Sequence, residues 1–495
     1  MTLGKIFDRI PLRTELPETA ANLVVEDLDY DSRRVRPGCL FFAFQGAHAD
    51  GRAYAADAVS RGAVAVASEL ARPAGLDVPW IEVEHGRRAM AMAARALFRA
   101  PDERLTVTGI TGTNGKTTIS YLVDSILRAA GKTTAVVGTI RYHVAGEIRP
   151  APNTTPESVD VWRILAELER RGGSHVTMEV SSHALALGRV YGLRFHTAIF
   201  TNLTRDHLDF HKTMEEYFAA KQLLFEGCGA PPPRFAAINA DDPAAGRLRV
   251  AGASEMLTYG LAPRADVRAL GVSATAAGLQ FDVQARGRSL HVRSPLLGMF
   301  NVHNILAACC AGMACGLDTE TISAGIEQCP AVPGRFERVD EGQPFTVVVD
   351  YAHTDDALRN LIQSARKITP GRVITLFGCG GDRDRTKRPL MGAAAAELSD
   401  FVVLTSDNPR SENPLAIMND AMVGLGRFET KHVAEPDRTT AIHLALAEAR
   451  AGDTVLIAGK GHETYQILAD RTIPFDDREV ARRTLRELGY SRGGQ

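Results

Sequence analysis

A glycine-bearing loop at residues 109–118, GITGTNGKTT, lies between an apolar run at 105–110 and a helix-like stretch at 119–130. Glycines let the backbone approach phosphate groups, and amide groups at a helix N-terminus supply positive potential. Lys116 can reach the outer phosphates of a nucleotide, and the Thr117 hydroxyl can bind Mg²⁺. Ile110 stands where the general P-loop has its first glycine. This departure restricts the loop to a narrower group of phosphate-binding loops than the general pattern describes. A plain strand-to-helix turn is the alternative, but the combined features favour a site for ATP.

Polar side chains end the next two predicted strands. Glu179 closes the apolar strand VTMEV, and residues 201–211, TNLTRDHLDFH, follow the strand after it. Both segments should face the loop, because open α/β sheets place their ligands at the carboxyl ends of strands. A carboxylate there suits Mg²⁺, which prefers oxygen ligands, although Glu179 could instead cap a helix or loop. His207 by itself is more often a structural residue, since Mg²⁺ seldom binds imidazole.

Composition restricts the class of protein. The 495 residues, 45% hydrophobic and 23% charged, are typical of a globular protein with room for about three domains. With a net charge of −2, the chain lacks the excess of positive charge that is typical of proteins that bind nucleic acid or a membrane surface. Seven cysteines without a CxxC pair favour reduced, mostly buried thiols. With neither a signal-peptide pattern nor a run of ~18 apolar residues, we expect a cytoplasmic protein with no nucleic-acid partner and no membrane insertion.

Apolar runs divide the chain into three predicted α/β domains. Residues 1–98 form a small N-terminal unit with short strands and helices. Residues 103–332 alternate strand-like runs with helix-length segments, as a mainly parallel sheet in a P-loop ATPase-like domain requires. The strand-like runs of this central domain lie at 105–110, 134–140, 176–180, 197–202 and 236–239.

Residues 335–495 are predicted to form a Rossmann-like domain. Four apolar runs, at 346–349, 372–377, 401–405 and 454–457, each end in a polar or glycine-rich cluster. The clusters read DYAHTDD, GCGGDRDRTKRP, SDNPRSENP and AGKGHE. Because the carboxyl ends of parallel strands meet at one edge of a sheet, we expect this domain to carry part of the ligand site.

Seven motifs, in their order along the chain, resemble those of the Mur ligases of peptidoglycan synthesis, and the resemblance covers essentially the whole chain. They are GTNGKTT, MEVSSH, NLTRDHLDFH, YFAAK ending at Lys221, FNVHN at 300–304, DYAH at 350–353 and GKGHE at 459–463. Within that family, DSR at 31–33, the following GAHADGR, NTTP at 153–156 and DNPR at 407–410 look like the ligases that add the third amino acid.

The resemblance implies an ATP-dependent amide ligase of cytoplasmic peptidoglycan precursor synthesis. Its substrates would be UDP-N-acetylmuramoyl-L-alanyl-D-glutamate and meso-diaminopimelate, bound by the N-terminal and C-terminal domains respectively. The D-glutamate γ-carboxylate would attack ATP to give an acyl phosphate, which the amine of diaminopimelate then displaces. Mg²⁺ would be the metal, and we expect a monomer.

Three other functions stay open at this point. The same type of ligase could add L-lysine. A folylpolyglutamate synthase-like ligase shares the loop and the chemistry, but it is not expected to carry the N-terminal uridine-binding domain or DNPR. A non-catalytic, nucleotide-gated binding protein would show degenerate phosphate or metal residues, whereas Lys116, Thr117, Glu179 and His207 are all present.

The resemblance also implies the catalytic and metal-binding residues. The catalytic residues would be Lys116, Glu179, His207 and Lys221. The metal ligands would be Thr117, Glu179, His207 and Lys221, the last as a carbamate. From its sequence context alone Lys221 would be a solvated helix lysine, and only the resemblance assigns it a role.

Three binding groups follow from the same mapping; without it, many of these residues would be ordinary turn and cap residues. The ATP group is Gly112, Thr113, Asn114, Gly115, Lys116, Thr117, Thr118, Asn301, Asn304, Arg335, Asp350 and His353. The UDP-substrate group is Tyr30, Ser32, Ala47, His48, Ala49, Asn153, Thr154, Thr155, Ser181, Leu187 and Arg189. The diaminopimelate group is Arg383, Asp407, Asn408, Pro409, Arg410, Gly459 and Glu463.

Two positions depart from the family pattern. Leu187 stands where relatives often have glutamine, which affects one polar substrate contact. Asp355 stands where the common form of DYAHTDD has proline. Proline would only stiffen that turn, so we expect the aspartate to change the site little.

Overall fold

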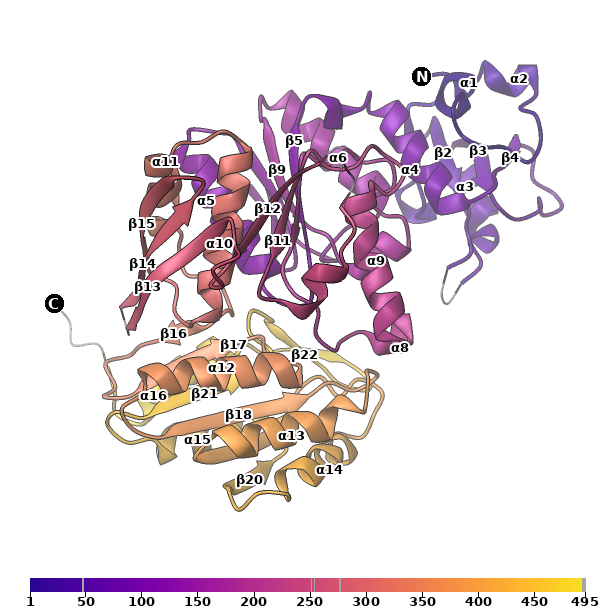
Figure 1. Ribbon diagram of the computed structural model, residues 1–495. Coiled ribbons are helices and arrows are strands. Elements are labelled where there is room, and N and C mark those ends of the chain that lie inside the picture. The colour runs from indigo at the N-terminus through magenta and orange to yellow at the C-terminus, as the bar shows by residue number, and fades with distance from the viewer. Residues whose placement is uncertain (47–48, 251, 253, 276, 492–495) are drawn as a thin grey trace.

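Three α/β domains follow one another along the chain in the computed structural model, which describes residues 1–46, 49–250, 252, 254–275 and 277–491 (Figure 1). The central domain contacts the other two. The strands of each of the three main sheets lie inside one of the three predicted domain ranges. The domain boundaries themselves remain predictions.

The N-terminal domain is built on a four-stranded parallel sheet in the order β1-β2-β3-β4. Helix α4 packs against helix α6 of the central domain, which joins the two units. The elements are α1 (Leu3–Phe7), α2 (Glu18–Ala21), β1 (Asp27–Asp29), β2 (Cys39–Phe42), α3 (Ala55–Ser60), β3 (Ala63–Ser68), β4 (Trp80–Glu82) and α4 (Gly86–Leu97).

The central domain carries an eleven-stranded sheet in the order β15-β14-β13-β12-β11-β10-β5-β9-β6-β7-β8. Its strands are β5 (Thr106–Thr111), β6 (Thr134–Val137), β7 (Arg141–Val144), β8 (Glu147–Pro150), β9 (His175–Glu179), β10 (Thr197–Phe200), β11 (Phe235–Asn239), β12 (Glu255–Gly260), β13 (Val267–Thr275), β14 (Gly278–Ala285) and β15 (Arg288–Ser294). Its helices are α5 (Lys116–Ala129), α6 (Ser158–Arg170), α7 (Ser182–Ala186), α8 (Leu208–His211), α9 (Met214–Glu226), α10 (Phe300–Ala314) and α11 (Thr319–Glu327).

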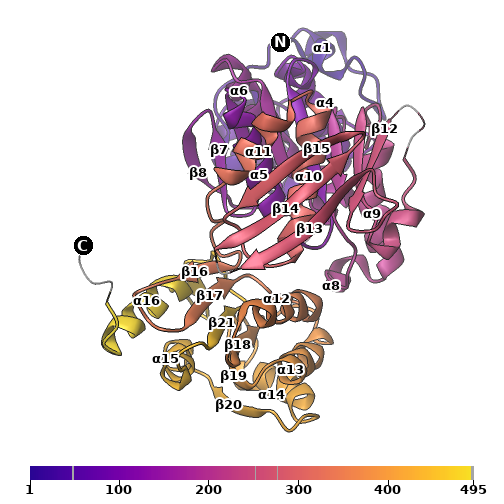
Figure 2. The same ribbon diagram turned by 60° about the vertical axis from the view of Figure 1, so that its left-hand side comes forward.

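The middle of this sheet is parallel, as predicted, and both edges are antiparallel. Central strands are buried on both faces and read as continuous apolar runs, whereas β14 alternates buried and exposed residues. That alternation explains why a search for apolar runs found the central strands but missed β13, β14 and β15. Figure 2 shows these three strands side by side, with their lower ends directed at the C-terminal domain.

The C-terminal domain has a six-stranded sheet in the order β16-β17-β21-β18-β19-β20, parallel except for β16. Its strands, with a separate hairpin β22–β23, are β16 (Glu337–Val339), β17 (Thr346–Asp350), β18 (Val373–Cys379), β19 (Phe401–Ser406), β20 (Lys431–Glu435), β21 (Thr454–Ala458), β22 (Tyr465–Ile467) and β23 (Thr472–Pro474). Its helices are α12 (Asp355–Ile368), α13 (Lys387–Leu398), α14 (Pro414–Leu425), α15 (Arg438–Glu448) and α16 (Asp477–Glu487).

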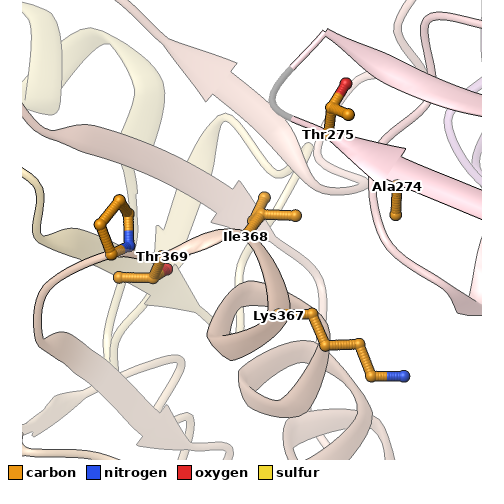
Figure 3. Close-up of a pocket in the computed structure, with 6 residues that line it drawn as sticks. Ala274, Thr275, Lys367, Ile368 and Thr369 are labelled. Atoms are coloured by element: carbon orange, nitrogen blue, oxygen red, sulfur yellow. The ribbon is translucent and has the colours of Figure 1, made fainter.

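Helix α12 faces the central domain along the border between the two domains. Near its C-terminal end a cavity of about 350 Å³ opens between the ends of β13 and α12 (Figure 3). Ala274 and Thr275 line one side, and residues 367–370 line the other. The helix begins at Asp355, roughly 20 Å away by helix geometry, beside the phosphate loop.

The cysteines are free, and most are buried, as predicted. Among the described helices, none is both long and apolar enough to cross a membrane.

Candidate active site

The loop predicted to bind phosphate connects β5 to α5, and Gly115 caps the helix. Gly112 and Gly115 have φ of 144° and 90°, which L side chains rarely adopt. A Cβ at Gly112 would collide with the Thr201 hydroxyl, and one at Gly115 would collide with the Asn304 side chain. Glycine is therefore required at both positions, and the helix N-terminus stays open for an anion.

The Lys116 ammonium lies over its own loop. Its Nζ donates to the Gly112 carbonyl at 2.9 Å and to the Thr113 carbonyl at 2.8 Å. Burial lowers the pKa of Lys116, while the charges of Glu179 and Asp206 act in the opposite direction. The lysine is thus held at the loop, where it can turn toward a phosphate.

Glu179 faces the loop, as predicted from its place at the end of β9. The residue is 1% exposed. Its Oε2 accepts from the Thr117 hydroxyl at 3.1 Å and from the Thr139 hydroxyl at 3.0 Å. Its Oε1 accepts from the Thr139 amide at 2.8 Å, so Glu179 also caps a loop.

The oxygen atoms of Glu179 and Thr117 are suitable ligands for Mg²⁺. Glu179 forms no ion pair with the described residues, so its buried charge lies beside the Thr117 hydroxyl without a paired cation. The described part of the chain contains no group of three histidine, cysteine or carboxylate side chains that could hold a metal. Mg²⁺ commonly uses one or two carboxylates together with substrate phosphates and waters, so the small donor set suits a nucleotide-bound ion.

His207 is the residue that precedes α8, with a φ of 56°, and its ring meets that of His183 edge to face at 4.8 Å. Burial lowers the pKa of His207 to about 3, so the imidazole is neutral near pH 7. Its Nε2 lies 3.5 Å from Asp206 Oδ2. The histidine therefore sits beside a carboxylate that the sequence reasoning did not select.

Lys221 is 1% exposed on α9, which contradicts its interpretation as a solvated helix lysine. Its Nζ donates to the Gly112 carbonyl at 2.8 Å and lies 4.3 Å from the centre of the Tyr217 ring. Burial, with a smaller effect from the charge of Lys116, lowers the pKa of Lys221 well below its usual value. The amine is thus held beside the phosphate loop in an environment that disfavours its charge.

The C-terminal domain completes this side of the site. Arg335 Nη2 donates to the Thr117 hydroxyl at 3.1 Å. Asn114 Nδ2 donates to Asp356 Oδ2 at 3.1 Å, which connects the loop to the first turn of α12. The two domains therefore meet at the phosphate loop.

The other predicted ATP-group residues divide between the two domains. Asn304 Nδ2 donates to Asn301 Oδ1 at 2.7 Å on α10, next to Gly115. Asp350 is buried and accepts from the amides of Phe336 and Ala352 at 2.6 and 2.8 Å, so it shapes the backbone after β17. His353 Nε2 lies 3.8 Å from Asp206 across the domain border.

The predicted UDP-substrate residues form two groups. Thr155 Oγ1 donates to the Glu179 carbonyl at 2.8 Å and accepts from the Ser181 amide at 3.1 Å, beside the metal side of the site. Arg189 Nη1 donates a hydrogen bond to the Thr155 carbonyl at 3.0 Å. Nearby lie Asn153, Thr154 and the half-buried Leu187.

The second group belongs to the N-terminal domain. Tyr30 donates to Asp160 of α6 at 2.9 Å, and Ser32 is buried while Ala49 is exposed. Ala47 and His48 lie outside the described residues.

The predicted amino-acid site lies at the carboxyl ends of β18, β19 and β21. Arg410, with a φ of 53°, donates through Nη1 to the Gly381 carbonyl at 2.7 Å. A Cβ at Gly380 would contact both Arg410 and the exposed Arg383. Asn408 Nδ2 donates to Glu463 Oε2 at 2.8 Å, and Gly459 adopts a φ of 115° close to Asp407. The site thus has guanidinium groups on one side and carboxylates on the other, with Pro409 between Asn408 and Arg410.

Comparisons with known proteins agree with this architecture. Three family models match in order: "Mur ligase family, catalytic domain" over residues 25–97, "Mur ligase middle domain" over 110–312 and "Mur ligase, glutamate ligase domain" over 334–461. A relative from Solibacter usitatus named UDP-N-acetylmuramoyl-L-alanyl-D-glutamate--2,6-diaminopimelate ligase is 63% identical over 490 residues, 99% of each chain. The chain belongs to the Mur ligase family.

Other Mur ligases support the same placement. A relative of the same name from Geobacillus kaustophilus is 47% identical over 93% of this chain and 95% of its own. A solved structure of a ligase with that name matches with a TM-score of 0.70 and 33% identity over 99% of this chain and 100% of that one. MurF from Acinetobacter baumannii, at 21% identity over 92% of this chain and 95% of its own, shares the fold with a TM-score of 0.68. This Mur ligase is therefore an enzyme with the three-domain α/β fold that was predicted.

Sequence reasoning missed four residues of the site. Asp206 and Lys460 lie inside recognised motifs, next to residues that were selected. Asp356 is the last residue of the predicted strand-end cluster DYAHTDD, but it was not selected. Thr139 had no motif, and only the fold shows that it holds Glu179 with both its amide and its hydroxyl.

Replacing Thr139 by valine is expected to lower kcat/KM of the ligase about tenfold, because a hydrogen bond to a buried carboxylate contributes roughly 1.5–3 kcal/mol. The Thr139 hydroxyl also lies 3.1 Å from that of Thr154, so its loss affects the metal side and the UDP-substrate side together. Steady-state kinetics measures the effect. Thr139→Ser, which keeps the hydroxyl, should stay near wild type; equal activity in both variants would show that the hydroxyl has no role.

Proposed function

We propose that this Mur ligase adds meso-diaminopimelate to the γ-carboxylate of UDP-N-acetylmuramoyl-L-alanyl-D-glutamate, driven by ATP. One observation carries the proposal: the DNPR segment with Arg410 lies at the strand ends of the C-terminal domain, in a chain 63% identical to a ligase named for diaminopimelate. The nucleotide-linked substrate places the reaction in the cytoplasm. We also propose that the enzyme acts as a monomer.

The first half of the reaction takes place at the phosphate loop. The loop amides and Lys116 would hold the β- and γ-phosphates of ATP, and Arg335 would approach from the C-terminal domain. The substrate carboxylate attacks the γ-phosphorus, the bond to the bridging oxygen breaks, and ADP leaves. The product is an acyl phosphate, and positioning with charge neutralisation does most of the catalysis.

Thr117, Glu179, His207 and the carbamate of Lys221 would hold Mg²⁺. The ion would neutralise charge on the transferred phosphate. A carbamate forms when the neutral lysine amine attacks CO₂ and releases a proton, which leaves a negatively charged side chain. The burial of Lys221 supports this assignment, because its lowered pKa favours the neutral amine.

The second half of the reaction joins the two substrates. The amine of diaminopimelate attacks the acyl carbon, a tetrahedral intermediate forms, and phosphate leaves to give the amide. Asp407, Asn408 and Glu463 would orient the amino acid through its ammonium, while Arg383 and Arg410 would hold a carboxylate. These contacts would define the orientation in which the amine meets the acyl phosphate.

Release of phosphate with the UDP-dipeptide and one amine at a time tests the function. Meso-diaminopimelate should support turnover far better than L-lysine. A preference for L-lysine would replace the proposed substrate by the alternative amine. No turnover with either amine, in a folded protein that binds ATP, would overturn the ligase assignment for this UDP-dipeptide.

Arg410→Ala should reduce kcat/KM for meso-diaminopimelate by at least roughly thirtyfold while changing that for L-lysine far less. The guanidinium can take the distal carboxylate in two parallel hydrogen bonds, and L-lysine lacks that carboxylate. An unmet charge of this kind commonly costs about 2–5 kcal/mol. Kinetics with both amines measures the change in preference.

Arg385→Ala provides the matched control, because Arg385 is exposed and pairs with Asp420 at 3.1 Å on the surface. That variant should keep the preference of the wild type. Equal losses for both amines in Arg410→Ala would show that Arg410 does not recognise the distal carboxylate.

A further inference from the structure

A buried lysine, Lys460, lies at the centre of the proposed amino-acid site. Its side chain is 0% exposed, and its Nζ donates to Glu463 Oε2 at 2.9 Å and to Asn408 Oδ1 at 3.0 Å. Asn408 Nδ2 donates to the same Glu463 oxygen at 2.8 Å. The three side chains therefore close a triangle, which we call the Lys460 triangle, between the ends of β19 and β21.

The triangle orients two side chains. The amide of Ile467 donates to Asn408 Oδ1 at 3.0 Å, so both hydrogen bonds to that oxygen define which way the Asn408 amide faces. Both donors to Glu463 converge on Oε2. Among the described residues none donates to Glu463 Oε1, although the side chain is only 12% exposed. A carboxylate oxygen in such a place is ready to accept from a ligand, because polar groups at low exposure are normally hydrogen-bonded.

The charges around the triangle point to the kind of group that Oε1 accepts. Asp407 and Glu463 bring two negative charges and Lys460 brings one positive charge. Burial raises the pKa of Asp407, but the charges of Lys460 and Arg438 outweigh burial, so that its pKa lies below the usual value. Arg438 is itself paired with Asp477, through two contacts of 2.8 Å. On the side of the site opposite the guanidinium groups of Arg383 and Arg410, one negative charge is therefore left over, which matches a single ammonium group.

We propose that Lys460 is a positioning residue for the amino-acid substrate: it holds Glu463 so that Oε1 faces the ammonium, and it leaves one negative charge on this side of the pocket. The inference rests on the proposed function, because it assumes that the amino acid binds at these strand ends. Without Lys460, Glu463 loses its only ion-pair partner among the described residues. The carboxylate is then expected to turn away from the substrate.

Lys460→Met keeps the length of the side chain and removes its charge. We expect KM for meso-diaminopimelate to rise about tenfold or more, since hydrogen bonds to charged groups are the stronger ones. The KM values for ATP and for the UDP-dipeptide should change less than about twofold, because those substrates bind elsewhere. Steady-state kinetics with each substrate varied in turn measures this split.

Lys460→Gln provides a second variant that restores a hydrogen-bond donor without the charge. It should give a KM between those of the wild type and Lys460→Met, and it keeps the test available should the methionine variant fold poorly. In a Glu463→Gln background, adding Lys460→Met should raise KM by much less than it does alone, because Lys460 acts through Glu463. Full additivity of the two changes would overturn the proposal.

Arg372→Met is the matched control for the loss of a cation from the same sheet. Arg372 pairs with Asp453 at 2.8 Å before β18 and β21 begin, at the opposite edge from the site. It should lower the melting temperature without a selective rise in KM for the amino acid. The same pattern in Lys460→Met would assign Lys460 a purely structural role.

Two further outcomes are decisive. A fall in KM for the amino acid in Lys460→Met would show that Lys460 occupies the place of the substrate ammonium, and it would overturn the positioning role. A wild-type enzyme that does not use meso-diaminopimelate would instead contradict the proposed function, and this is measured first. An unchanged KM in Lys460→Met, with an active wild type, would overturn the role of Lys460 alone.

Discussion

Lys116→Ala should lower the rate of ligation roughly a hundredfold or more, while the protein stays folded. The lysine is the cation of the phosphate loop, and a preorganised charge of this kind contributes about 3 kcal/mol or more to the transition state. Among the described residues, its Nζ donates to two carbonyls of its own loop, so alanine removes little else from the fold. Phosphate release at saturating substrates measures the effect.

Lys132→Ala is the matched control, because Lys132 is an exposed lysine just beyond the C-terminal end of the same helix, α5. It should keep the activity of the wild type. Thermal unfolding of both variants separates loss of chemistry from loss of structure. Near-normal turnover in a folded Lys116→Ala enzyme would contradict the proposed ATP-driven mechanism.

Lys221→Ala should be nearly inactive, with a loss of at least about a hundredfold, and a short carboxylic acid such as acetate should restore part of the activity. The variant leaves a space beside the Gly112 carbonyl, and a carboxylate there would replace the negative group of the carbamate. Removal of CO₂ and bicarbonate from the wild type should lower its activity reversibly. Kinetics with and without each additive measures both effects.

Lys221→Arg distinguishes the carbamate from a simple cation. Guanidinium stays positively charged and cannot form the adduct, so full activity in that variant would exclude a carbamate role. Lys212→Ala, at an exposed lysine shortly before α9, is the control and should respond to neither acetate nor bicarbonate. Rescue of Lys212→Ala or of the wild type by acetate would show that the additive acts elsewhere.

The sequence predicted the parts of the site that are local in the chain. The phosphate loop needs two glycines, a lysine and a threonine within a few residues, and its strand and helix are its direct neighbours. Glu179 was found because a buried parallel strand reads as a continuous apolar run that ends in a polar residue. The strand-end clusters of the C-terminal domain followed from the same rule, which says that parallel strands bring their carboxyl ends to one edge.

Some residues became recognisable only through their family resemblance. Lys221 lies in YFAAK, where nothing nearby distinguishes it from a solvated lysine. The amino-acid and UDP-substrate residues are Asn, Asp, Arg, Ser and Thr in loops, which are common there for reasons of turn geometry. Their roles stay predictions until the variants described above are measured.

By itself, then, the sequence determined the three α/β domains, the parallel core strands and the loop chemistry, because each depends on a pattern among neighbouring residues. Only the tertiary structure decided that Lys221 is buried, because its Nζ meets the carbonyl of a glycine 109 residues away in the chain. The same holds for the contact of Asn114 with Asp356 and for the hold of Thr139 on Glu179. The pKa of a side chain and its hydrogen-bond partners depend on burial and on segments that are distant in the chain. No local pattern of residues predicts either.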